Sequence, residues 1–377
     1  MDVKYYLRRI FNKLHIGLPL TNVLNANNSQ SCLLVYVQDP FFKINVNSSH
    51  QAYLQILELV KIMDELGYNV DVINYQSEKV LLTKQYDAVF DICVKEKPVY
   101  RKKLKADARK IVYFTGSESE FANNAELERI KNVEKRRGAK IQPRRQAYPI
   151  LKEVENYDEA ILIGNEYTLA TYRGFKLQRP HVVPNTGYDF GDRFDITTRK
   201  TNNFLYFGSV GCVHKGLDLL LEVFAEKDFP CNLYVCGNFE NEKDFRDEYE
   251  RELYHTSNIK PVGFIDIWSD KFAEICSECS YTILPSCAEG MAGTICTCMS
   301  AGLIPICSKI CGYTENPEVI TLSNCSKDCI RQTVLEYAGK ELDWIQEQSQ
   351  KVLMLTKEKY SIAAFTEAMK AALSEVL

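Results

Sequence analysis

The stretch Phe207-Gly-Ser-Val-Gly-Cys-Val-His-Lys-Gly-Leu-Asp218 decides the fold, because it places a glycine-bearing loop between a strand and a helix. The apolar run Phe204–Phe207 predicts the strand, and a helical pattern follows from Lys215. Gly208 and Gly211 allow the backbone to turn tightly and to approach a ligand closely. The Lys215 ammonium and the backbone N–H groups of a helix start both favour an anion. A phosphate fits this position, although a structural turn explains a glycine loop equally well.

A second glycine loop reads Pro285-Ser-Cys-Ala-Glu-Gly-Met-Ala-Gly-Thr294. It follows a predicted strand, Tyr281–Leu284, and precedes a predicted helix, Ala292–Ala301. Glu289 lies in this loop, at the carboxyl end of the strand. A carboxylate repels phosphate, so its better partners are hydrogen-bond donors such as sugar hydroxyls. A solvated loop side chain or a helix cap is the alternative interpretation of Glu289.

The same alternation of short apolar strands and helices extends in both directions along the chain. Strands alternating with helices indicate crossover connections and parallel sheets. The sequence therefore predicts an α/β protein with two doubly wound, Rossmann-like domains facing a cleft. We expect the first domain over residues 1–200, with residues 1–20 as a candidate surface helix. We expect the second over residues 201–377, with its last helices as candidates for packing back on the first.

The composition is that of an ordinary globular protein: 377 residues, 46% apolar, 25% charged and a formal net charge of −4. Its longest apolar runs, such as Cys32–Val37, are far shorter than the ~20 residues of a membrane-spanning helix. Charged residues also interrupt the first twenty positions, so the apolar middle of a secretory signal is missing. We expect a cytoplasmic protein. The stretch Tyr5–Leu18, basic beside an apolar face, suits either an anionic membrane surface at the inner face of the membrane or packing on the protein's own domain.

Fourteen cysteines stand in a long chain in which no export signal is recognised, so we interpret them as reduced thiols. Most of them follow residue 211 and interrupt apolar stretches, where a thiol serves as a small hydrophobic side chain. Cys276 and Cys279 form a CxxC pair. No second pair at zinc-finger spacing accompanies it, and we expect no metal site.

Positive charge is concentrated in residues 95–145, which hold 16 Lys or Arg against 7 Asp or Glu. Such a segment suits the phosphates of a substrate or lipid head groups, and a solvated helical surface explains it as well. No recognition-helix pattern or run of basic residues interleaved with aromatics supports nucleic acid. We expect no nucleic-acid partner.

At this point the residues resemble a known family. Phe207–Phe224 and Ile283–Ile306 are similar to the two signature regions of the C-terminal domain in group 1 (family 4) glycosyltransferases, which have the GT-B architecture. The resemblance extends from about Cys32 to the C-terminus and is strongest over residues 204–308. It implies a retaining, metal-independent enzyme without a cofactor, whose substrate is a nucleotide-sugar donor.

The resemblance implies roles for particular residues. Lys215 stands where the family has a lysine that contacts the donor diphosphate, and Glu289 where it has a glutamate that touches the donor sugar. These two are the candidate catalytic residues. The remaining candidates for binding the donor are Gly208, Ser209, His214, Gly290, Met291, Ala292, Gly293, Thr294 and Thr297.

Two positions depart from the family pattern. Thr297 stands where the family usually has a glutamate that holds the ribose, and Ser209 where it often has a basic residue. His214 is a candidate for part of the missing positive or donor character, or else a plain surface residue. In the first domain, Thr115, Gly116 and Ser117 follow a predicted strand and match the location of acceptor contacts, although a simple turn explains them as well.

The function expected from these residues is transfer of a sugar to a hydroxyl of a glycan or lipid-linked glycan, in cell-surface or capsular polysaccharide synthesis. Two alternatives stay open. A sugar-nucleotide epimerase shares the architecture, although the histidines do not group in the sequence. A non-catalytic protein of the same fold that binds nucleotide sugar or glycan would explain the departures at Ser209 and Thr297.

Overall fold

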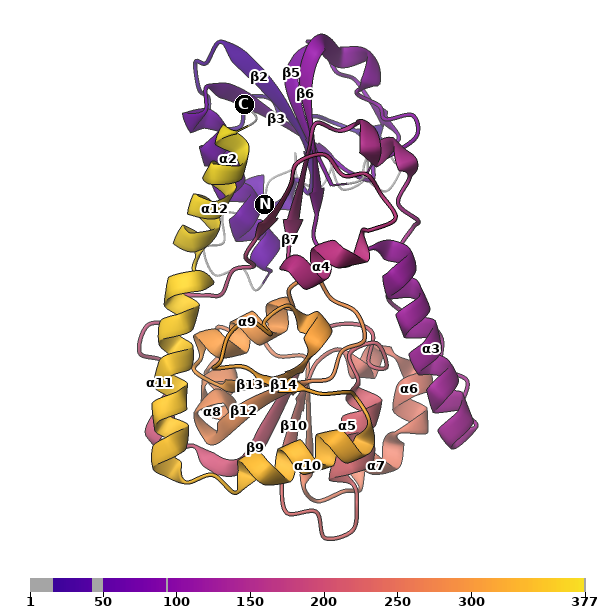
Figure 1. Ribbon diagram of the computed structural model, residues 1–377, viewed down its shortest axis with the longest axis vertical. Coiled ribbons are helices and arrows are strands. Elements are labelled where there is room, and N and C mark those ends of the chain that lie inside the picture. Colours follow the sequence, from indigo (N-terminus) through magenta and orange to yellow (C-terminus); the bar gives the residue numbers. More distant parts are fainter. Residues whose placement is uncertain (1–15, 43–49, 93, 376–377) are drawn as a thin grey trace. The chain divides into compact units, whose positions relative to one another are not determined.

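The computed structural model describes residues 16–42, 50–92 and 94–375, and the chain divides into two compact units (Figure 1). Unit 1 contains the chain up to Thr115, the segment Ile150–Pro184 and the chain from Ile362 onward. Unit 2 contains Gly116–Pro149 and Asn185–Ser361. Each unit holds one six-stranded sheet in which every described pairing is parallel. The prediction of two α/β, Rossmann-like domains is confirmed.

The sheet of unit 1 has the order β3-β2-β5-β6-β7-β8. Its central strands are buried and rich in aliphatic residues, as parallel strands covered on both faces must be. β6 begins at Leu104, and its first half carries exposed polar side chains that an apolar pattern does not capture. The strands are β2 (Gln30–Tyr36), β3 (Tyr68–Asn74), β5 (Tyr86–Asp91), β6 (Leu104–Phe114), β7 (Glu159–Ile163) and β8 (Pro180–Val183), beside a short parallel pair of β1 (Ile16–Gly17) and β4 (Lys79–Val80).

The helices of unit 1 come from distant parts of the chain. They are α2 (Gln51–Glu65), α4 (Glu166–Thr171) and α12 (Ile362–Ser374). α12, near the C-terminus, packs against α2 (Figure 1). The helix that ends the chain therefore completes the unit with which the chain begins.

The sheet of unit 2 has the order β11-β10-β9-β12-β13-β14. This is the strand order of a dinucleotide-binding fold, in which the first strand of the unit lies at the centre. Phe204 on β9 stacks on Tyr281 of β12 with ring centroids 4.8 Å apart, and both are fully buried. The strands are β9 (Lys200–Phe207), β10 (Asn232–Cys236), β11 (Ile259–Gly263), β12 (Cys279–Leu284), β13 (Ile304–Ser308) and β14 (Ile320–Leu322).

Helices of unit 2 cover this sheet. The helical pattern expected after the first glycine loop forms α5, in which Leu217, Leu220, Leu221 and Phe224 are buried. Leu219 and Val223 are buried as well, so α5 is enclosed on every side. The helices are α3 (Ser119–Arg137), α5 (Leu217–Phe224), α6 (Lys243–Glu248), α7 (Glu250–Tyr254), α8 (Asp270–Glu278), α9 (Gly293–Ser300), α10 (Lys327–Ala338) and α11 (Leu342–Lys359).

α3 and its flanking residues belong to unit 2, although they lie before residue 200 in the chain. The observed units differ from a single boundary at residue 200 at this segment, whereas α12, one of the last helices of the chain, belongs to unit 1. The basic stretch 95–145 is accordingly shared between the units. α3 buries only Ser119, Glu126 and Val133, so it presents no apolar face from which its packing could be predicted.

The thirteen cysteines within the described residues are free thiols, and ten of them are buried. Cys276 and Cys279 are fully buried, and burial raises the pKa of both thiols well above the usual value. These positions are those of small packing residues. The candidate surface helix over residues 1–20 lies almost wholly outside the described residues.

Candidate functional site

Two loops of unit 2 lie at the carboxyl ends of neighbouring strands. The β9–α5 loop, residues 208–216, follows β9, and the β12–α9 loop, residues 285–292, follows β12. β9 lies between β10 and β12, so the strand order reverses between β9 and β12. In open parallel sheets, ligands bind at such a switch point. The two loops therefore form the candidate site.

The loops are held in contact by backbone groups. The Cys287 N–H donates to the His214 carbonyl at 2.9 Å. Gly216 has a φ of +76°, and a Cβ atom there would lie 2.5 Å from the Pro285 carbonyl oxygen. Only glycine permits both this conformation and this approach. Because Gly216 caps α5, the helix begins at Leu217, and Lys215 lies in the loop before the helix rather than within it as predicted.

A buried carboxylate from outside the β9–α5 loop binds to the backbone of that loop. Glu242, which is 2% exposed, accepts hydrogen bonds from the N–H groups of Gly211 at 2.5 Å and Cys212 at 3.1 Å. The Gly208 N–H donates to the Cys236 carbonyl at 2.9 Å. The N–H groups of Gly208, Gly211 and Cys212 therefore already donate hydrogen bonds within the protein. Ser209, between them, is partly buried.

Lys215 and Glu289 form a buried ion pair across the two loops. The Lys215 Nζ lies 2.5 Å from Glu289 Oε1, and the two side chains are 4% and 9% exposed. The Ser286 hydroxyl donates to the same oxygen at 2.8 Å. Burial would raise the pKa of Glu289, but the charges of Lys215 and its neighbours outweigh it and lower this pKa to about 2. The structure thus brings together the two predicted catalytic residues, with Glu289 held ionised.

His214 is buried beside this pair, with 2% of its surface exposed. Its Nε2 lies 2.6 Å from the Ala288 carbonyl oxygen and must carry the proton, because a carbonyl only accepts. Its Nδ1 is buried without a hydrogen-bond partner among the described residues. Burial lowers the pKa of His214, so the ring is neutral near pH 7. His214 is therefore a neutral buried group and adds no positive charge to the site.

Hydrogen bonds from other segments of unit 2 to its backbone fix the β12–α9 loop. Met291 is buried, and its carbonyl accepts from the Asn185 amide at 2.8 Å. The Ala292 N–H donates to the Cys311 carbonyl, and the Ala292 carbonyl accepts from the Tyr313 hydroxyl, both at 2.9 Å. This arrangement makes the loop a preformed, rigid surface. The remaining predicted residues of the loop and the helix start are Gly290, which is buried, and Gly293 and Thr294, which are partly buried.

Two hydroxyl groups near the start of α9 differ in their partners. Thr297 is 4% exposed, and its hydroxyl donates to the Gly293 carbonyl one turn earlier at 3.0 Å. The Thr294 hydroxyl is buried with no hydrogen-bond partner among the described residues. Thr294 therefore has an unused donor at the helix start, whereas Thr297 uses its hydroxyl within the helix.

The predicted acceptor residues fall on both sides of a unit boundary. Thr115 ends the first segment of unit 1 and is exposed. Gly116 and Ser117 begin the segment that belongs to unit 2, where the Ser117 hydroxyl donates to the Glu289 carbonyl. Arg129 on α3 similarly donates to the Pro285 carbonyl at 2.9 Å. The α3 segment therefore contacts the β12–α9 loop directly.

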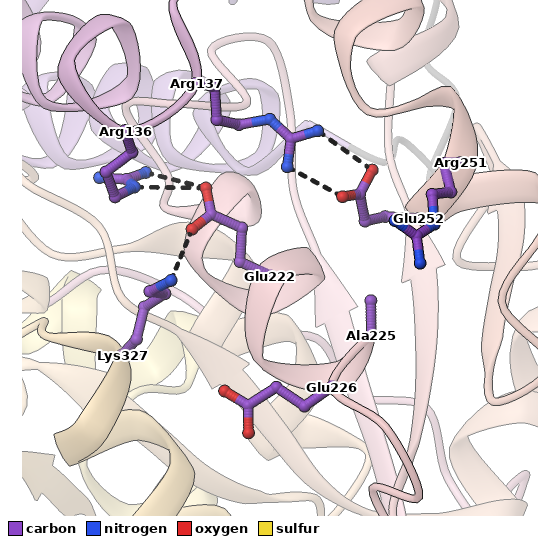
Figure 2. A pocket seen from close by; sticks show the side chains of 8 residues that line it. All are labelled: Arg136, Arg137, Glu222, Ala225, Glu226, Arg251, Glu252 and Lys327. Carbon is purple, nitrogen blue, oxygen red and sulfur yellow. Dashed lines mark hydrogen bonds and ion pairs between the residues drawn. The ribbon is translucent and has the colours of Figure 1, made fainter.

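Ion pairs hold the C-terminal end of α3 on unit 2, and we call this group the α3 clasp. Arg136 and Lys327 both pair with Glu222, at N–O distances of 3.2 and 3.0 Å. Figure 2 shows both side chains pointing toward the Glu222 carboxylate. Arg137 pairs with Glu252 at 2.8 Å and with Glu248 at 2.7 Å. A cavity of about 420 Å³ lies among these side chains. Charge pairs thus take the place of the apolar face that α3 lacks.

One further contact of the clasp is buried. Arg136 lies 2.7 Å from Asp218 Oδ2, and the Asp218 side chain is fully buried. Its Oδ1 has no hydrogen-bond partner among the described residues. Burial raises the pKa of Asp218 to about 6, although Arg129 and Arg136 act in the opposite direction. Asp218 belongs to the stretch that decides the fold, and its partner comes from α3.

Several residues of the site were not found from the sequence. Glu242 and Asn185 contact the loops but lie outside both glycine stretches. Arg145 also lies near the β9–α5 loop, with its Cγ 2.6 Å from the position that a Cβ on Gly211 would take. The excess of basic residues in 95–145 was the available signal for Arg145, but it could not assign that residue to unit 2.

Unit 1 carries a separate basic cavity of about 680 Å³ over the first half of β6. Tyr100 and Tyr157 line it, and their hydroxyls lie 2.7 Å apart. Positive side chains exceed negative ones around it. They are Lys95, Lys97, Arg101, Lys105 and Lys110 against Glu96 and Glu153.

The described residues contain neither a metal-ligating cluster nor a membrane-spanning helix. Over residues 16–42, 50–92 and 94–375, no three His, Cys, Asp or Glu side chains gather in a group that could hold a metal ion. In the same part of the chain, every helix is too short or too polar to cross a bilayer.

One family model matches part of the chain. Residues 201–329 match the model of the family described as glycosyl transferases group 1. This match covers about a third of the chain and contains both loops. No curated protein matches the chain by sequence.

Solved structures share the fold at low identity. The match to sucrose-phosphate synthase from Thermosynechococcus elongatus has a TM-score of 0.62 and 13% identity, covering 92% of this chain and 98% of that one. Anabaena HepE, solved with UDP and glucose, gives 0.59 and 10%, covering 92% and 100%. Staphylococcus aureus TarM gives 0.52 and 15%, covering 74% of this chain and 54% of TarM, so the aligned region spans about half of TarM. The fold is that of GT-B glycosyltransferases, and the resemblance noted in the sequence is confirmed.

Proposed function

We propose that this chain transfers a sugar from a nucleotide-sugar donor to a hydroxyl of a glycan or lipid-linked glycan. The observation that carries this proposal is the buried Lys215–Glu289 pair. It lies at the switch point of the unit 2 sheet, inside the segment that matches group 1 glycosyltransferases. A buried cation beside a carboxylate that stays ionised suits a ligand with both phosphates and sugar hydroxyls.

Each residue of the pair has a distinct part in the proposed reaction. The bond between the sugar C1 and the diphosphate oxygen breaks, and negative charge develops on the leaving diphosphate. Lys215 stabilises that charge, and the Thr294 hydroxyl donates to the same phosphates. Glu289 accepts hydrogen bonds from the sugar hydroxyls and orients the ring.

The acceptor hydroxyl forms the new bond to C1 on the same face, so the configuration is retained. Its proton passes to the departing phosphate oxygen. This route needs no metal and no separate general base. No cofactor is required beyond the nucleotide sugar itself.

Two observations support the choice of ligands. HepE was solved with UDP and glucose, and a TarM variant with UDP and an α-GlcNAc-glycerol. Uridine nucleotides are therefore the first donors to test. The basic cavity of unit 1 favours an acceptor that carries phosphate or carboxylate groups, as glycans of capsules and cell surfaces and their lipid-linked precursors do.

A binding protein without turnover is the second candidate. It is favoured by Thr297, whose hydroxyl is bound to the Gly293 carbonyl and offers no carboxylate to a ribose. Such a protein would bind nucleotide sugar but release no nucleoside diphosphate. The two candidates therefore differ in one measurement.

The test combines thermal shift with an assay of nucleoside diphosphate release. UDP-glucose, UDP-GlcNAc, GDP-mannose and ADP-glucose are compared on the full chain. A donor that binds should raise the melting temperature, and release should require an acceptor glycan. If none of the four donors shifts the melting temperature, the donor site is refuted. If a donor binds but no acceptor supports release, the binding protein replaces the enzyme.

The variant for this test is Lys215→Met/Glu289→Gln, which removes both charges together and leaves no unpaired buried charge. We expect it to fold and to lose transfer by roughly 100- to 1,000-fold, the usual effect of removing one stabilising group from a transition state. Lys271→Met/Glu274→Gln is the matched control, because it removes an ion pair of the same composition that is more than half exposed. Equal activities of the two double variants would contradict the proposed role.

A further inference from the structure

We propose that Arg145, from the segment that follows α3, binds the diphosphate of the donor and supplies the positive charge of this site that no carboxylate neutralises. The inference rests on the proposed function, because it names a residue that would recognise the same ligand. It goes beyond the two signature loops, since Arg145 lies outside both. Neither the family match nor the resemblance assigns a role to it.

The Arg145 side chain lies against the β9–α5 loop where that loop lacks a side chain. Its Cγ and Cδ atoms lie 2.6 and 3.3 Å from the position that a Cβ on Gly211 would take. Gly211 has a φ of +95°, a conformation that other residues rarely adopt. Gly211 therefore both shapes the loop and leaves space for the stem of Arg145.

The backbone of Arg145 is held by a buried carboxylate of α3. Glu126, which is 1% exposed, accepts from the Arg145 N–H at 3.0 and 3.1 Å and from the Arg144 N–H at 3.0 Å. It also accepts from the Gln146 side chain at 2.8 Å. Glu126 therefore fixes the backbone of Arg145 to α3, and the α3 clasp fixes α3 to the rest of unit 2. These contacts hold Arg145 in place beside the β9–α5 loop.

The two neighbouring arginines differ in what their side chains contact. Arg144 pairs with Asp244 at 2.5 Å. The Arg145 guanidinium is exposed and has no hydrogen bond or ion pair with any residue in 16–42, 50–92 or 94–375. An exposed guanidinium on an anchored backbone is ready to form bidentate contacts with phosphate.

The charges around the loop show why such a cation is needed. Lys215 is neutralised by Glu289, and the His214 ring is neutral. The Glu242 carboxylate lies behind the loop and occupies two of its amides. Without Arg145, the net charge of Lys215, Glu289, His214 and Glu242 is negative. A diphosphate ligand is itself an anion, so these residues alone would repel it. Arg145 lies close enough for its charge to lower the pKa of both Glu289 and His214.

The experiment is a charge series at this exposed position, Arg145→Lys, Arg145→Ala and Arg145→Glu. Binding of UDP, ADP and GDP, and of the corresponding nucleosides, is measured by calorimetry on the full chain. We expect Arg145→Ala to weaken binding of the nucleoside diphosphate roughly 10- to 100-fold. The affinity of Arg145→Lys should lie between those of the unchanged chain and Arg145→Ala, and Arg145→Glu should bind more weakly than Arg145→Ala. Binding of the nucleoside should change little, because it carries no phosphate.

Arg144→Ala is the matched control, since it removes an adjacent arginine whose charge is already paired. It should leave the diphosphate affinity within about twofold of the unchanged chain. If the whole Arg145 series binds as the unchanged chain does, while Lys215→Met/Glu289→Gln loses binding, the inference fails and the proposed function stands. If the unchanged chain binds none of the three diphosphates, the proposed function fails and takes this inference with it.

Discussion

Glu289 and Asp218 are both buried carboxylates beside the β9–α5 loop, yet their pKa values move in opposite directions. The pKa of Glu289 falls to about 2, whereas that of Asp218 rises to about 6. Burial raises the pKa of each. The opposite outcomes must therefore come from what surrounds each carboxylate.

Hydrogen bonds and neighbouring charges account for the difference. Glu289 Oε1 accepts from both Lys215 and Ser286, and the charge of Arg145 also lowers the pKa of Glu289. Asp218 receives one hydrogen bond from Arg136 on Oδ2, its Oδ1 has no partner among the described residues, and the Glu222 carboxylate is a like charge nearby. A single ion pair leaves the pKa of a fully buried carboxylate above its usual value. The environment of Glu289 suits ligand chemistry, and that of Asp218 suits attachment of α3.

The largest effect is expected from Lys215→Met, which breaks the more buried of the two pairs. We expect it to lower the free energy of unfolding by roughly 5 kcal/mol at pH 7, because the Glu289 charge is left buried and unpaired. The loss should shrink near pH 4, since the unpaired carboxyl can take a proton. Urea denaturation at both pH values measures it. Lys215→Met/Glu289→Gln should recover most of the loss, and a single variant as stable as the unchanged chain would show that the pair is not buried.

A smaller effect is expected from Arg136→Ala, which removes the partner of Asp218. The Arg136 side chain is 26% exposed, and Lys327 still pairs with Glu222, so we expect a loss of roughly 3 kcal/mol at pH 7.5. The loss should be smaller at pH 5, where Asp218 is largely protonated. Lys135→Ala, one residue earlier on the exposed surface of α3, is the control and should change stability by less than about 0.5 kcal/mol. An equal loss at the two pH values would contradict the raised pKa of Asp218.

The smallest effect concerns the pH dependence of Asp218→Asn. The folded pKa of Asp218 is about 6 and its unfolded pKa about 3.9, so its contribution to stability is present below pH 4 and lost as the pH rises through 6. The stability of Asp218→Asn relative to the unchanged chain should therefore improve by about 2 kcal/mol between pH 4 and pH 7. The contribution of Glu289 to stability depends on pH in the opposite direction. Because its pKa is lowered in the folded chain, this contribution is present above pH 4.3 and is lost as the pH falls toward 2. A flat difference across pH 4 to 7 would refute the assignment for Asp218.

The sequence predicted the fold and the two loops because both depend on local pattern. Short apolar strands, glycine loops and the helix of Leu217–Phe224 are all read within a few residues of each other. Lys215 and Glu289 could be named for the same reason, since each lies in a loop at the end of a strand. Their mutual contact depends on β9 and β12 being neighbours in the sheet, which the alternating pattern alone does not specify.

The rest of the site depends on contacts between distant segments. Glu242 reaches the loop from 31 residues away, and Arg136 reaches Asp218 from 82 residues away. Nothing in the spacing of either residue indicates these partners. α3 buries almost no apolar surface, so hydrophobic periodicity gave no sign of where it packs. The burial of His214 was missed similarly, because its neighbours in sequence suggest a loop on the surface.

The division of the chain into segments has a consequence for any shortened form of the protein. The chain passes between the units four times, after Thr115, Pro149, Pro184 and Ser361. A fragment of residues 201–377 would carry the whole family match but would lack Arg136, Arg145 and Glu126. It would bury the Asp218 carboxylate with no counter-ion and expose the surface that α3 covers. Neither unit is a single continuous segment, so neither can be obtained by a single cut.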